Sequence, residues 1–92
     1  MGYVYILRCA DNTLYTGSTR YLELRLNEHK AGVGAQYTKV RRPLELVFVE
    51  RFNSVQQAFY KEKQIQNWSQ KKKVALINSK YNQLKEFSKK SF

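Results

Sequence analysis

The chain has 92 residues, enough for one domain and too few for two. Seventeen Lys and Arg against seven Asp and Glu give a formal charge of +10, which indicates a polyanionic partner: nucleic acid first, an anionic membrane second. No apolar run approaches the roughly 20 residues that span a bilayer, and the first residues lack a signal-peptide pattern, so we expect no membrane association. A single cysteine, Cys9, excludes an internal disulfide and fits a reducing cytoplasm.

The first elements in the chain are predicted to be two strands. Residues 3–9 form a short apolar run that is rich in β-branched and aromatic residues, which is typical of a central strand. Residues 10–13 favour a turn, and residues 14–18 resume an extended pattern. Together they predict a hairpin.

A helix should follow the hairpin, begun by Ser18 or Thr19 and ended by Gly32 in a left-handed conformation. Residues 32–42 are expected to form a basic loop that contains Tyr37. Residues 44–52 predict a third strand, entered through Pro43, which cannot donate a ladder hydrogen bond.

Two further helices close the predicted fold. Ser54 and Gln57 are spaced as a capping box for a helix that runs to about Trp68, and residues 69–77 predict a shorter helix. The order ββαβαα predicts an α+β fold: a small three-stranded, mainly antiparallel sheet flanked by helices. We expect residues 1–80 to be one domain and residues 81–92 a basic, helix-prone C-terminal tail.

Charged residues interrupt the apolar faces of two predicted helices. Arg25 lies within the stripe of Leu22, Leu26 and His29, and Glu62 lies within the stripe of Val55, Ala58, Phe59 and Ile65. A charge on a buried face is costly unless it is paired, bound to a metal or open to a cleft. The two residues predict either one structural Arg25–Glu62 ion pair or a functional site with His29. In a basic protein, an inward carboxylate such as Glu62 suits a Mg²⁺ or Mn²⁺ ion.

Two strand tyrosines are candidates for the same site. Tyr5 and Tyr15 share a face of the hairpin only if the loop between the strands has an odd number of residues or a bulge. We predict the odd loop, with both hydroxyls facing the site.

These residues resemble a known family. Tyr3-Val4-Tyr5 and Tyr15-Thr16-Gly17 look like the paired GIY and YIG elements of the GIY-YIG nuclease domain, although Tyr3 replaces the first glycine and Thr16 an isoleucine. The similarity continues through an arginine, a histidine and a glutamate in the family's order, and covers residues 3 to about 77. Val74 stands where several active relatives have asparagine. The chain is most similar to the small stand-alone bacterial members with a single domain.

The resemblance implies a metal-dependent endonuclease that hydrolyses phosphodiester bonds, with DNA a better candidate than RNA. It implies that Glu62 holds the metal, Arg25 binds the phosphate, Tyr5 is the general base with His29 as its relay, and Tyr15 orients water or phosphate. We expect a monomer without a separate DNA-binding domain. The basic surface of this domain would then contact phosphates without sequence preference. The predicted contact residues are Lys39, Arg41, Arg42, Lys71, Lys72 and Lys73.

Two alternatives stay open at this point. One is a nucleic-acid-binding module that keeps the fold without cleavage. The other is a protein-interaction or ribosome-associated adaptor that uses Phe52, Trp68 and the basic tail.

Overall fold

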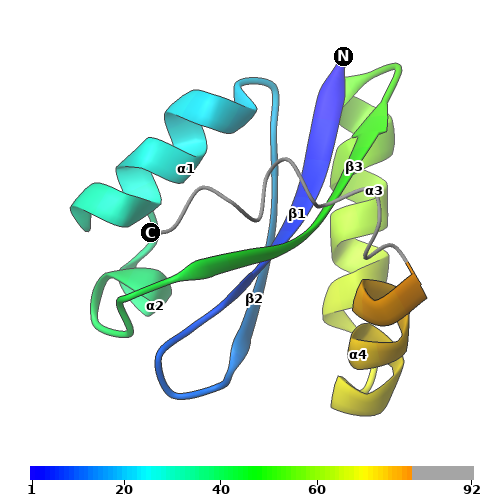
Figure 1. Cartoon of the computed structure of the whole chain (residues 1–92). Helices are drawn as coiled ribbons and strands as arrows, with labels where there is room; N and C mark the ends of the chain where they lie inside the picture. The colour runs from blue at the N-terminus through cyan, green and yellow to red at the C-terminus, as the bar shows by residue number, and fades with distance from the viewer. Residues whose placement is uncertain (80–92) are drawn as a thin grey trace.

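The computed structural model describes residues 1–79, in which helices cover both faces of a three-stranded antiparallel sheet (Figure 1). The strands are β1 (Gly2–Arg8), β2 (Leu14–Thr19) and β3 (Glu45–Phe52), in the order β2-β1-β3. The central position of β1 explains why its sequence is apolar on both faces, since Val4, Ile6 and Leu7 are each at most 1% exposed. The predicted α+β class and antiparallel sheet are confirmed.

Four helices accompany the sheet: α1 (Leu22–Ala31), α2 (Gln36–Lys39), α3 (Val55–Gln66) and α4 (Gln70–Ser79). In Figure 1, α1 and α2 lie on one side of the sheet and α3 and α4 on the other. Helix α3 packs against β1 and β2 through buried Ala58 and Ile65. The edge strand β2 therefore lies between two helical layers, and side chains from both can reach it.

Several helix boundaries follow the predicted signals. Gly32 ends α1 with φ of 81°, and Ser54 caps α3 by accepting a hydrogen bond from the Gln57 amide at 3.1 Å. The start of α1 was predicted wrongly. Tyr21 is its N-cap residue and gives no side-chain cap; Thr19 instead accepts from the Tyr21 amide, and Ser18 belongs to β2.

Two other expectations need correction. The loop predicted at residues 32–42 contains the short helix α2, for which the sequence has no apolar periodicity to read. Phe59, predicted on the inward face of α3, is 47% exposed and packs on its neighbour Tyr60. The buried face of α3 is correspondingly narrow.

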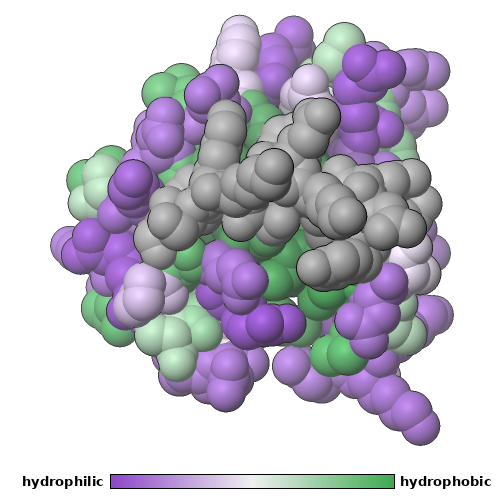
Figure 2. Space-filling model, in the orientation of Figure 1, coloured by the Kyte–Doolittle hydropathy of each residue, from purple (hydrophilic) through white to green (hydrophobic). Residues whose placement is uncertain are grey.

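The structure places no helix long and apolar enough to cross a bilayer within residues 1–79. The predicted basic tail, residues 81–92, lies outside the described residues. On the face shown in Figure 2, hydrophilic side chains occupy much of the visible periphery.

Candidate active site

The two candidate tyrosines lie on the same face of the hairpin. Tyr5 is opposite Gly17 and Tyr15 is opposite Leu7, and directly opposed residues of an antiparallel pair share a face. Because Leu7 is two residues from Tyr5, all four lie on that face. The five residues 9–13 connect the strands, so the predicted odd loop is confirmed.

Gly17 is required by the close approach of Tyr5. A Cβ atom added at Gly17 would lie 2.5 Å from the Tyr5 hydroxyl oxygen and 2.6 Å from the ring carbon that carries it. A larger residue would displace the phenol. The glycine of the second sequence element thus makes room for the tyrosine of the first.

His29, one turn after Arg25 on α1, contacts Tyr5. Its Nε2 atom is 2.8 Å from the Tyr5 hydroxyl, and both residues are 1% exposed. Burial, helped by the positive charge of Arg25, lowers the pKa of His29 to about 4. At neutral pH the imidazole is therefore uncharged, and one of its ring nitrogens carries a lone pair.

Burial also shifts the pKa of the two phenols, Tyr5 and Tyr15. It raises the pKa of Tyr5 well above its ordinary value, with Tyr15 adding to the increase, and it raises the pKa of Tyr15. Arg25 opposes both shifts, so its guanidinium acts on both hydroxyls, but burial is the larger effect. Tyr5 therefore needs a partner such as His29 to take its proton.

Arg25 is the accessible cation of this cluster. Its side chain is 34% exposed and pairs with Glu28, three residues further along α1, at 3.2 Å. The alternative expectation, a structural ion pair between Arg25 and Glu62, is wrong, because Arg25 pairs with Glu28 instead. Glu62 has other hydrogen-bond partners.

Glu62 reaches the edge strand from α3, on the opposite side of the sheet. Its Oε1 accepts from Ser18 Oγ at 2.5 Å and its Oε2 from Gln66 Nε2 at 2.7 Å. Gln66 also donates to the main-chain oxygen of Thr16, at 3.3 Å. The Glu62 charge makes a minor contribution that raises the pKa of Tyr5 and of Tyr15, but its hydrogen bonds are with Ser18 and Gln66 and not with the other four candidate residues.

Glu62 has the properties of a single-carboxylate metal ligand. Its side chain is only 13% exposed, and each carboxylate oxygen accepts one hydrogen bond, with the Lys63 ammonium 3.9 Å from Oε2. No cluster of three or more His, Cys, Asp or Glu that could hold a metal occurs in residues 1–79. A hard cation that takes most of its ligands from water and phosphate fits this donor set.

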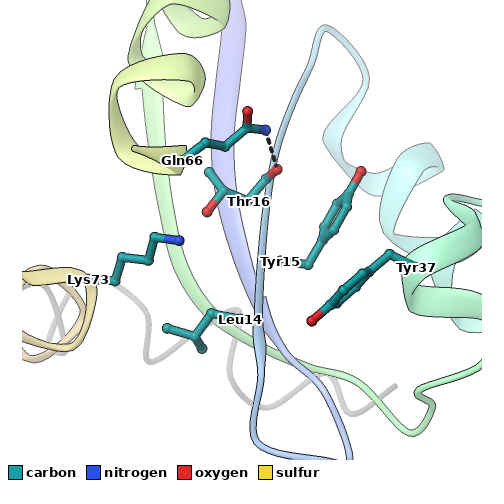
Figure 3. A pocket seen from close by; sticks show the side chains of 6 residues that line it. All are labelled: Leu14, Tyr15, Thr16, Tyr37, Gln66 and Lys73. Atoms are coloured by element: carbon teal, nitrogen blue, oxygen red, sulfur yellow. Dashed lines mark hydrogen bonds between the residues drawn. The ribbon is translucent and has the colours of Figure 1, made fainter. Parts of the chain in front are cut away.

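A groove of about 240 Å³ crosses β2 beside these residues (Figure 3). Tyr15 and Tyr37 stand on one side of the strand, while Gln66 and Lys73 approach from the other. The two tyrosine rings are stacked with centroids 6.0 Å apart, and the Arg41 guanidinium lies 3.9 Å from the Tyr37 centroid. Lys73, one of the predicted phosphate-contact residues, therefore lines the groove, whereas Arg41 contacts the Tyr37 ring and pairs with Asp11 at 3.1 Å.

The other predicted basic residues are less directly connected with it. Lys39 is exposed on α2, and Arg42 donates to the main-chain oxygens of Lys30 and Lys39. Lys71 is exposed on α4, and Lys72 lies over the Trp68 ring at 4.3 Å. Phe52 and Trp68, the anchors of the adaptor alternative, are partly buried against the core.

Sequence reasoning missed four residues of this region: Ser18 and Gln66, which hold Glu62, Thr38, which contacts His29, and Gly34, which lies against the His29 ring. None has a distinctive local pattern. Ser18 was noticed only as a helix cap. The one available signal was that a buried carboxylate such as Glu62 needs hydrogen-bond donors from nearby side chains.

A small α+β domain with two hairpin tyrosines, an arginine and a histidine on one helix and a glutamate on another defines a recognisable class of catalytic domain. The model of the GIY-YIG catalytic domain matches residues 1–82, and the chain belongs to this family.

The relatives are small proteins of similar length. A UPF0213 protein of Staphylococcus haemolyticus is 46% identical over 85% of this chain and 95% of its own length. A UPF0213 protein of Natronomonas pharaonis is 52% identical over 82% of this chain and 88% of its own. The solution NMR structure of a UPF0213 protein from Bacillus halodurans superposes with a TM-score of 0.59 at 39% identity, covering 88% of this chain and 87% of that one.

Proposed function

We propose that this protein is a metal-dependent endonuclease that hydrolyses phosphodiester bonds in DNA at the edge strand β2. The observation that carries the proposal is the Tyr5–His29 pair beside Tyr15 on one face of the sheet, with Arg25 acting on both phenols, and Glu62 bound to Ser18 of β2 from the other face. Membership of the GIY-YIG catalytic domain family supports the same reaction.

The accessible residues would receive the phosphate. Arg25 would direct its planar guanidinium at the non-bridging oxygens, where negative charge increases in the transition state. Tyr15, half-buried on β2, would orient the phosphate or the attacking water. A divalent ion such as Mg²⁺ held by Glu62 would supply Lewis-acid stabilisation of that charge.

The buried pair would move the proton. Tyr5 is 1% exposed, so the proposal requires a water molecule to reach its hydroxyl when the substrate binds. As Tyr5 takes the proton of the water, its own proton would pass to His29 Nε2, 2.8 Å away. The low pKa of His29 keeps it uncharged at neutral pH, so a ring lone pair is available, and the proton would stay on this weak base only while the water proton moves to Tyr5.

The test compares two Glu→Gln variants in a cleavage assay. Pure protein is incubated with labelled single-stranded, duplex and branched DNA, with Mg²⁺ or with a chelator. Glu62→Gln should lose metal-dependent cleavage by at least about 100-fold while binding DNA nearly as well. Glu45→Gln, which removes the same charge at an exposed site paired with Arg8, should cleave normally.

Equal cleavage by Glu62→Gln and wild type would refute the assignment of Glu62. Binding of DNA by the wild type without cleavage of any substrate would instead assign the non-catalytic nucleic-acid-binding module. Preferential cleavage of RNA in the same assay would reassign the substrate and keep the mechanism.

A further inference from the structure

Thr38 on α2 contacts the ring nitrogen of His29 that faces away from Tyr5. The distance from His29 Nδ1 to Thr38 Oγ1 is 2.8 Å, and Thr38 Oγ1 is 3.0 Å from the main-chain oxygen of Ala35, to which it donates. A threonine hydroxyl has one hydrogen, and a carbonyl oxygen can only accept. With its hydrogen directed at Ala35, Thr38 must accept a hydrogen bond from His29, and this places a proton on Nδ1.

The tautomer follows from this assignment. A neutral imidazole with its proton on Nδ1 has a lone pair on Nε2. This lone pair faces the Tyr5 hydroxyl, which then donates to His29. The chain of donors is therefore Tyr5 to His29, His29 to Thr38, and Thr38 to Ala35.

The surroundings leave little room for another arrangement. Thr38 is fully buried and His29 is 1% exposed. A Cβ atom added at Gly34 would lie 2.6 Å from His29 Nδ1, so the backbone there closes over the ring. Thr38 therefore supplies the hydrogen-bond acceptor that Nδ1 requires in this buried place.

We propose that Thr38 is a positioning residue that fixes His29 in the Nδ1-protonated tautomer, so that Nε2 accepts the proton of Tyr5. The proposal rests on the proposed function for its catalytic consequence, but its structural part stands apart from any cleavage. In the opposite tautomer Nε2 would carry a hydrogen, donate to Tyr5 and be unable to accept its proton. The same Thr38 contact serves the charged imidazolium, in which both ring nitrogens donate.

The chain has one histidine, which makes the tautomer directly measurable. In the uniformly ¹⁵N-labelled full chain at pH 7, two-bond ¹H–¹⁵N correlations of the imidazole should show a protonated Nδ1 and an unprotonated Nε2. Thr38→Val keeps the shape of the side chain and removes the hydroxyl, so it should shift His29 toward the Nε2-protonated form. Thr38→Ser should restore the wild-type spectrum.

Cleavage by the same proteins gives a second readout. Thr38→Val should lower kcat by at least about tenfold with little change in KM, and Thr38→Ser should recover most of it. A wild-type spectrum with a protonated Nε2 would overturn the proposal, whether or not the variants fold. An unchanged tautomer in folded Thr38→Val would also overturn it. If no protein cleaves but the spectra respond as expected, only the proposed function fails.

Discussion

At the scale of single residues, the buried neutral state of His29 has a consequence for stability. Its pKa is lowered to about 4 in the folded chain, against about 6.5 when unfolded, because burial and Arg25 disfavour the charged imidazole; Glu28 opposes this weakly. A histidine whose pKa is lower in the folded chain than in the unfolded chain stabilises the fold at pH values above its unfolded pKa. That contribution is lost as the pH falls toward the folded pKa, and it amounts to about 3 kcal/mol.

The free energy of unfolding, measured by urea titration, should therefore decrease between pH 6.5 and pH 4. His29→Gln cannot take up a proton in either state, so its stability should change less over this range. The comparison is between slopes, because the substitution also removes the hydrogen bond to Tyr5. Equal slopes for the two proteins would show that His29 is protonated as easily in the fold as outside it.

At the scale of elements, Gln66 joins α3 to the edge strand. It donates to the Thr16 main-chain oxygen and to Glu62, and Ser18 holds the other Glu62 oxygen. Gln66→Ala should cost about 1 kcal/mol of stability and speed hydrogen exchange at the β2 amides. Gln64→Ala, on an exposed position of the same helix, is the matched control. Equal rates of hydrogen exchange at the β2 amides in both variants would show that the Gln66 hydrogen bonds do not hold β2 against α3.

The same elements show how far a sequence can be interpreted. The apolar run of β1, the cap at Ser54 and the stop at Gly32 are local signals, and the structure has all three where they were expected, although α1 begins later than predicted. Arg25 and Glu62 could be singled out from the sequence because a charge on an apolar face needs a reason. Thr38 and Gln66 could not be found this way, because their partners lie on other elements and only the tertiary packing joins them.

Phe59 illustrates the opposite error. Its spacing fits the apolar stripe of α3, yet it is 47% exposed, because the narrow sheet covers only a limited face of this helix. Helical periodicity assigns a side chain to a face but does not measure how wide the covered face is. The exposure of such an aromatic residue can be recognised only when the packing of the helix on the sheet is known.

At the scale of the whole molecule, the charge of +10 should control binding. Each phosphate neutralised by Lys or Arg releases counterions, so DNA affinity should fall steeply between roughly 50 and 200 mM salt. Lys73 borders the groove across β2, and Lys73→Gln should therefore reduce the salt slope by about one. Arg8→Gln, at an exposed residue paired with Glu45, should leave the slope nearly unchanged. Fluorescence anisotropy with a labelled duplex across the salt series measures both, and a flat response in the wild type would contradict binding through phosphates.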